Sequence, residues 1–179
     1  IVDGNKKVNL REVVEAQADR LAAQNGTPIQ EIRHRELAGA QTEIGELSLI
    51  DYEYETSNTR EHFLQWVTPE NRIAGFLRLS LPCQHEVEKL QETEGAFPIE
   101  AGQAMIREVH VYGKVAQLHG EEQNAQHRGL GKALVERACE IAVEAGYRTI
   151  NVISAIGTRG YYARLGFEQA ELYQQRTLR

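Results

Sequence analysis

Gln126-His127-Arg128-Gly129-Leu130-Gly131 stands between an apolar run and a stretch with the periodicity of an amphipathic helix. A helix start leaves its first backbone N–H groups unpaired, and the helix dipole adds positive charge there, so an anion such as a pyrophosphate is stabilised. Gly129 and Gly131 let the main chain approach an oxygen atom closely, and Lys132 adds charge. A short Gly-x-Gly is equally typical of a plain turn before a helix, so the neighbouring segments must decide.

The segment after these glycines favours a helix followed by a strand. Its apolar residues recur at helical spacing: Leu130, Leu134, Ala138, Ile141, Ala142 and Ala145. Gly146 is placed as a C-cap, and residues 147–153 are typical of a short buried strand. Upstream, residues 104–118 predict another strand and residues 120–126 a polar surface loop. The expected order is strand, glycine loop, helix, strand.

The first half of the chain favours an antiparallel sheet. Strands are expected in residues 44–56, 62–67 and 73–81, with a turn at 69–71 as a meander requires. Residues 83–103 predict a polar excursion that could hold a helix. A helix is also expected over residues 9–25, with Leu10, Val13, Val14, Ala18 and Leu21 on one stripe.

Composition bounds the class of protein. The 179 residues, 41% hydrophobic and 26% charged, predict a soluble globular domain. No apolar run is long enough to span a membrane and no leader opens the chain, so we expect a cytoplasmic protein. The start at Ile1 without a methionine suggests a piece of a larger protein. Cys83 and Cys139 lack metal-ligand spacing and are expected to be free thiols, as His34 and His127 are expected to bind no metal.

The charge distribution permits nucleic-acid binding without demonstrating it. The net charge of −6 argues against a uniformly basic surface. However, residues 126–179 carry a balance of +3, and the acidic excess of −9 lies in residues 1–125.

Two motifs together resemble a known superfamily. Gln126-x-x-Gly129-x-Gly131 resembles the acetyl-coenzyme A signature of the GNAT acetyltransferases, and Tyr161 to Phe167 resembles their later Tyr-x-x-Leu-Gly-Phe block. The resemblance implies an α/β GNAT fold, which is a mixed, mostly antiparallel sheet. It also implies an acetyl-coenzyme A site at the strand, glycine loop and helix.

A closer resemblance covers almost the whole chain. Residues 106–113, 126–131 and 157–162 are similar to the carboxy-terminal acetyltransferase domain of the Elongator catalytic subunit and its bacterial and archaeal relatives, the tRNA wobble-uridine acetyltransferases. Residues 4–11 and 32–36 resemble the segment that joins this domain to a radical S-adenosylmethionine domain. We therefore expect a linker or docking segment in residues 1–40 and the acetyltransferase domain in residues 41–179.

The resemblance also implies partners and cofactors. These are tRNA, the radical S-adenosylmethionine domain and, as a further option, a second copy in a homodimer. S-adenosylmethionine and a 4Fe-4S cluster would act in the longer protein, where carboxymethyluridine is formed. Such a cluster needs three cysteines and this chain has two, so it cannot complete that reaction by itself. The linker also lacks the cysteines that relatives often carry, so no zinc site is expected.

Site residues follow from the same resemblance. The pantetheine arm would pair with the strand at Glu108, Val109, His110 and Val111. The pyrophosphate would lie on the amides of Leu130, Gly131 and Lys132, with Gln126 and Gly129 shaping the turn.

Three side chains are candidates for the chemistry. Tyr162, or its neighbour Tyr161, would protonate the departing thiolate, while one of the two faces the core. Glu108 would be a general base, or else an ion-pair partner of Arg107, Arg128 or another basic residue. His110 shares the face of Glu108 and is expected to be a structural histidine.

Three functions remain open on the sequence. The leading one is the acetyl-donating domain of a tRNA wobble-uridine modifying enzyme. The second is an ordinary N-acetyltransferase acting on protein lysine or a small amine, with Glu108 as the base. The third is a module that binds acetyl-coenzyme A without catalysis.

Overall fold

Four long strands form the antiparallel half of the sheet, as the alternation of apolar residues predicts. The computed structural model describes residues 9–37, 46–94, 99–112 and 121–179. The four strands are β1 (Ser48–Glu55), β2 (Thr59–Val67), β3 (Ile73–Pro82) and β4 (Gln103–Val111). Each pairs antiparallel with the next, and Asn71, at a φ of 63°, closes the predicted turn between β2 and β3. The helix α2 (Gln84–Glu94) lies in the polar segment 83–103, where a helix was considered.

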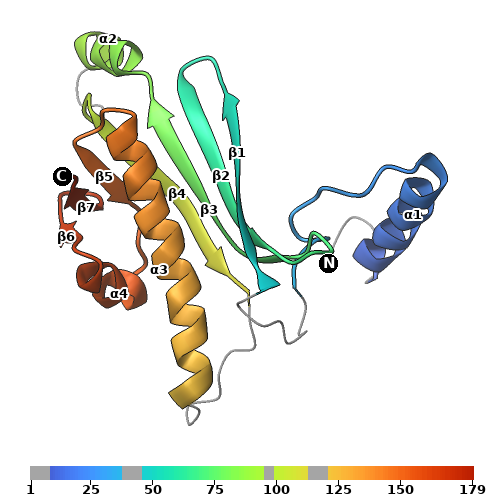
Figure 1. The fold of residues 1–179 in the computed structure, drawn as a ribbon. Coiled ribbons are helices and arrows are strands. Elements are labelled where there is room, and N and C mark those ends of the chain that lie inside the picture. The colour runs from blue at the N-terminus through green and yellow to red at the C-terminus, as the bar shows by residue number, and fades with distance from the viewer. Residues whose placement is uncertain (1–8, 38–45, 95–98, 113–120) are drawn as a thin grey trace, which may run out of the picture. The chain divides into compact units, whose positions relative to one another are not determined.

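A crossover helix joins this half of the sheet to a smaller second half. The helix α3 (Glu121–Glu144) connects β4 to β5 (Thr149–Val152), and these two strands are parallel, because a parallel pair needs a long connection. After η2 (Ile156–Thr158) and α4 (Arg159–Arg164), the short strands β6 (Glu168–Gln169) and β7 (Gln174–Thr177) complete the sheet. The order across its seven strands is β1-β2-β3-β4-β5-β7-β6 (Figure 1). A mixed and mostly antiparallel sheet was predicted, and it is confirmed.

The core lies between α3 and one face of the sheet. The helix α3 crosses one face of the sheet (Figure 1). Its apolar stripe is buried, with Leu134 and Ala138 fully inaccessible, and it packs against Leu77, Leu79 and Ile106 of the sheet. Burying each large aliphatic side chain contributes roughly 1.5–3 kcal/mol, so this stripe is the main stabilising contact of the domain.

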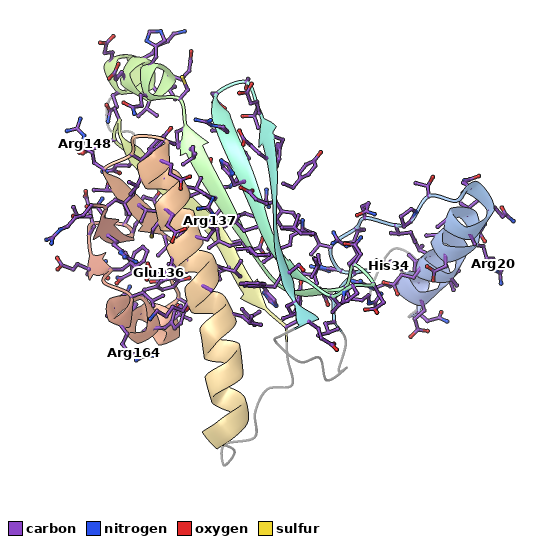
Figure 2. The ribbon with its side chains drawn as sticks, viewed as in Figure 1. Arg20, His34, Glu136, Arg137, Arg148 and Arg164 are labelled. Atoms are coloured by element: carbon purple, nitrogen blue, oxygen red, sulfur yellow. The ribbon has the colours of Figure 1, made fainter. Side chains whose placement is uncertain are left out.

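One ion pair ties the outer side of α3 to the last strand. Arg176 on β7 donates from Nη1 to both carboxylate oxygens of Glu136 at 3.1 Å. Glu136 is labelled on α3 in Figure 2. Both side chains are partly exposed, so this pair is worth less than a buried contact.

The chain divides into two compact units, residues 1–36 and 37–179, and each is described by itself. In the first unit α1 (Leu10–Asn25) ends at Gly26, which has a φ of 65°, as predicted. His34 returns to this helix and lies 3.2 Å from Asp19 (Figure 2). The apolar stripe of α1 is not buried: Val14 is 57% exposed, and the helix contains no buried residue.

Three details of the second half differ from the prediction. The surface loop expected over residues 120–126 is wrong, because α3 already begins at Glu121. The strand expected over 104–118 ends at Val111, and residues 113–120 lie outside the described part. β6 and β7 were not predicted, since they are short and mostly polar. Within the described ranges, no helix is long and apolar enough to cross a membrane.

Candidate functional site

Three of the predicted site residues meet where α3, α4 and the end of β4 converge. A Cβ atom placed on Gly131 would lie 2.9 Å from the Tyr161 hydroxyl oxygen and 3.5 Å from Cγ2 of Val111. The same test at Gly129 finds nothing within 4 Å. Glycine is therefore required at 131 by the close approach of Tyr161, and not at 129 by any contact described here.

Tyr161 presents a buried hydroxyl to this site. Its Oη atom has no hydrogen-bond partner among the residues that the structure describes. Burial, together with the neighbouring Tyr162 phenol, raises the pKa of Tyr161 to about 12. The phenol therefore keeps its proton at neutral pH and can donate a hydrogen bond to a ligand.

Tyr162 lies in a different environment. It is only 7% exposed, belongs to the core cluster, and packs edge-on against Phe167 with the ring centroids 5.5 Å apart. Burial raises the pKa of its phenol as well. The sequence favours Tyr162 as the cofactor contact, whereas it is the Tyr161 hydroxyl that the geometry brings to Gly131.

The second half of β4 has a free side toward β5. Pairing with β5 runs from Gln103 opposite Thr149 to Ile106 opposite Val152 and ends there in the described part of the chain. Beyond that point β4 continues through Glu108, Val109, His110 and Val111, which still pair with β3 on the other side. The strands separate at the segment where the resemblance places a pantetheine arm, and the backbone there can accept a further strand-like partner.

Glu108 and His110 are both exposed and lie on one face of β4, as predicted. The Glu108 carboxylate lies 3.9 Å from Arg78, so the expected ion pair forms with a partner that the sequence did not single out. His110 stacks on Phe76 and contacts Tyr112, with ring centroids 6.0 and 4.6 Å apart. This packing is what a structural histidine would show.

The start of α3 does not match the predicted phosphate cradle. Leu130, Gly131 and Lys132 lie about ten residues inside the helix that begins at Glu121, where amides donate to carbonyls four residues earlier. Their N–H groups are therefore not the unpaired groups of a helix start. The backbone of Gln126 lies in α3, and its side chain is outside the described set.

No metal centre is seen in the described ranges, where no group of three or more His, Cys, Asp or Glu comes together. Cys83 is exposed and Cys139 is buried on α3, and burial raises the pKa of the Cys139 thiol to about 11. A thiol with that pKa stays protonated and unreactive at neutral pH.

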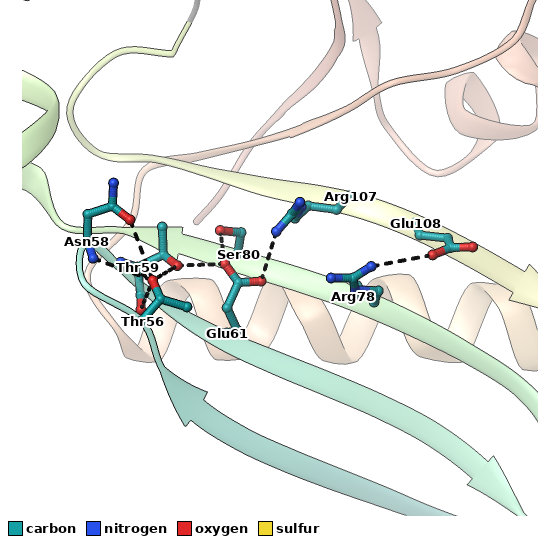
Figure 3. A network of polar contacts seen from close by, with 8 residues as sticks. All are labelled: Thr56, Asn58, Thr59, Glu61, Arg78, Ser80, Arg107 and Glu108. Atoms are coloured by element: carbon teal, nitrogen blue, oxygen red, sulfur yellow. Dashed lines mark hydrogen bonds and ion pairs between the residues drawn. The ribbon is translucent and has the colours of Figure 1, made fainter. Parts of the chain in front are cut away.

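Sequence reasoning missed a buried polar network on β2, β3 and β4. Its centre is Glu61, which is 2% exposed and hydrogen-bonded to Ser80 (Figure 3). The signal was weak. Glu61 is followed directly by His62 in β2, so the strand shows no clean alternation that would place Glu61 inside. A single acidic residue in a strand is more often on the solvent side.

Comparison with known proteins finds a matching family model and several similar proteins. A sequence model described as the acetyltransferase (GNAT) family matches residues 28–167. The tRNA uridine(34) acetyltransferase of Dehalococcoides mccartyi is 37% identical over 142 residues, covering 78% of this chain and 29% of that protein. Elongator complex protein 3 of Saccharomyces cerevisiae is 33% identical over 175 residues, covering 94% and 30%.

A solved structure extends the similarity to three dimensions. The archaeal Elp3 of Methanocaldococcus infernus, with an N-terminal deletion, superposes with a TM-score of 0.72 at 30% identity and covers 99% of this chain and 41% of that one. The chain thus spans about a third of the length of the curated relatives it matches.

Proposed function

Because this chain belongs to the acetyltransferase (GNAT) family, we propose that it is the acetyl-coenzyme A-binding domain of a tRNA wobble-uridine modifying enzyme. Its similarity to tRNA uridine(34) acetyltransferases and to Elongator complex protein 3 over most of its length supports this choice. The observation that carries it is the convergence of Gly131, Tyr161 and Val111 at the half of β4 that, among the described residues, pairs with β3 but not with β5.

The residues of this site fit acetyl-coenzyme A in part. The unpartnered Tyr161 hydroxyl beside Gly131 offers a hydrogen-bond donor close to the end of β4. The early start of α3 does not fit, since the amides of Leu130, Gly131 and Lys132 are free only if residues 121–128 leave the helix. We therefore propose that cofactor binding unwinds these first turns.

Acetyl-coenzyme A, when bound, supplies an acetyl group as a thioester. The backbone of Glu108 to Val111 would hold the cofactor as an added strand, and Tyr161 would keep a proton on Oη that it can donate. Tyr162 remains the alternative donor. Glu108 could act as a base once it separates from Arg78, and an exposed ion pair at 3.9 Å opposes that only weakly.

The radical step that the resemblance implies would need another domain. With two cysteines, one exposed on the surface and one buried on α3, this chain does not fit a 4Fe-4S cluster and its S-adenosylmethionine. In this proposal the domain provides the acetyl group, and the tRNA, the cluster and any homodimer contact belong to the longer protein.

Two other functions compete with this proposal. An N-acetyltransferase would use the same cofactor site, with Glu108 as base toward an amine. A non-catalytic module would bind acetyl-coenzyme A without hydrolysing or transferring its acetyl group.

The test is a calorimetric titration of the chain with acetyl-coenzyme A, followed by NMR of its backbone amides. We expect binding, loss of helical shifts over residues 121–128 and perturbation at Gly131. Binding with no change at Gly131 would contradict the site, and no binding at all would contradict the function. A uridine-modification assay of a longer protein that contains this domain, with Tyr161 intact and with Tyr161→Phe, would then separate donation of the acetyl group from binding of acetyl-coenzyme A alone.

A further inference from the structure

The single tryptophan of the chain, Trp66, reaches from the sheet to the helix beside the proposed cofactor site. It follows Leu64 by two residues on β2, so both side chains point to the face that α3 covers, and Trp66 packs against the core. Its Nε1–H group donates to the carbonyl oxygen of Leu130 at 3.4 Å. Because Leu130 directly precedes Gly131, this contact joins β2 to α3 where Tyr161 approaches the helix.

The neighbouring strands add a second contact to the same turn of α3. Trp66 lies opposite Gly75 of β3, which has no side chain, and the register of the two strands shifts directly after this pair, as at a β-bulge. A Cβ atom placed on Gly75 would lie 3.3 Å from Cγ2 of Val111 on β4. The same methyl group lies 3.5 Å from the Cβ position of Gly131. Trp66 and Val111 therefore hold two adjacent residues of α3, Leu130 and Gly131, against the sheet.

This turn divides the part of α3 that packs on the sheet from the part that lies beyond it. Leu130 is 6% exposed, whereas Gly129 is classed as exposed. The first turns of the helix, from Glu121 onward, continue past the end of β4 (Figure 1). They are the turns that, under the proposed function, unwind when the cofactor binds. Leu130 would then lie in the first turn of the shortened helix.

The hydrogen bond from Trp66 has a larger effect in the shortened helix than in the full one. In the full helix Leu130 lies about ten residues from the start and has helix on both sides. In the shortened helix it would lie at an end, where helices fray because the chain is held from one side only. The amides of Leu130, Gly131 and Lys132 can hold a pyrophosphate only if this new first turn stays in place.

We propose that Trp66 is a positioning residue of the acetyl-coenzyme A site, an inference that rests on the proposed function. It holds Leu130, and with it Gly131, against the sheet while the preceding turns unwind. Because this hold matters most in the cofactor-bound state, its loss shifts the equilibrium away from that state and lowers the affinity for acetyl-coenzyme A.

The direct test compares Trp66→Phe with Tyr147→Phe in calorimetric titrations with acetyl-coenzyme A. Each variant removes one hydrogen bond from an aromatic side chain to a backbone carbonyl, since Tyr147 Oη donates to the Pro82 oxygen at 2.6 Å, away from the proposed site. We expect Trp66→Phe to weaken binding by about three- to tenfold, which is the size of one net hydrogen bond, and Tyr147→Phe to leave it unchanged. Equal affinity in the two variants would overturn the proposal.

Backbone NMR supplies a readout that a purely structural tryptophan would not move. In the natural chain, the loss of helical shifts on binding should stop before residue 130. In Trp66→Phe it should extend beyond residue 130, because the new first turn is no longer held. Loss over the same residues in both chains would contradict the proposal.

The natural chain gives a third measurement that does not depend on how well a variant folds. Trp66 is the only source of an indole N–H signal, so that signal reports one hydrogen bond. We expect it to keep the shift of a hydrogen-bonded indole after acetyl-coenzyme A is added. A move to the shift of a free indole N–H on binding would overturn the inference.

These results stay distinct from a failure of the proposed function. A natural chain that does not bind acetyl-coenzyme A contradicts the proposed function itself. A natural chain that binds it, with Trp66→Phe and Tyr147→Phe binding equally well, retains that function and loses only the role of Trp66.

Discussion

Gly129 and Gly131 are two positions apart in α3 and have different surroundings, which makes them a matched pair. Gly131→Ala places a methyl group against the Tyr161 hydroxyl, so we expect affinity for acetyl-coenzyme A to fall by about tenfold as that hydroxyl is displaced. In Gly129→Ala the added methyl group has no atom within 4 Å. This variant should raise helix stability by about 0.5–1 kcal/mol and leave the affinity for acetyl-coenzyme A unchanged. Titration and urea unfolding of both variants check this, and equal loss of affinity would instead assign the glycines a backbone role.

The adjacent tyrosines can be told apart in the same way. Tyr161→Phe removes a buried hydroxyl that faces Gly131, and we expect acetyl-coenzyme A turnover to slow by roughly a hundred- to ten-thousand-fold with little change in binding. Tyr162→Phe keeps the ring that packs on Phe167 and should leave the rate near that of the natural chain. The reverse pattern in a turnover assay would give the role to Tyr162, as the sequence motif favours.

At the scale of elements, the sequence predicts what periodicity and turn chemistry determine. The stripe from Leu130 to Ala142 and the C-cap at Gly146 gave α3 its buried face and its end, because both depend on local spacing. The start of α3 was missed because polar residues before Gln126 fit a helix or a loop equally well. The Tyr161–Gly131 approach and the pairing of Arg78 with Glu108 depend on long-range register, which no local pattern contains.

Cys139 on α3 gives the stability of this helix a pH dependence. Its folded pKa of about 11 lies above the ordinary thiol value of 9.0, so its contribution is complete below pH 9 and is lost as the pH rises through 11. We expect the free energy of unfolding to fall over this range by about 2 kcal/mol more in the natural chain than in Cys139→Ala. Urea unfolding at several pH values under reducing conditions measures this. Identical pH profiles would mean that the thiolate is not penalised in the folded state.

At the scale of the whole molecule, α1 belongs to the first of the two compact units, residues 1–36. Its stripe residues Val13 and Val14 are exposed and the helix buries no residue, so this unit has little apolar burial of its own. We therefore expect removal of residues 1–26 to change the melting temperature by no more than about 2 °C, a shift that corresponds to about 0.5–1 kcal/mol in a domain of this length. Calorimetry of the shortened and full chains decides this. A large drop would show that residues 1–26 make contacts that stabilise the remaining residues, while an unchanged transition, with acetyl-coenzyme A affinity retained, would leave the exposed stripe of α1 available to a partner.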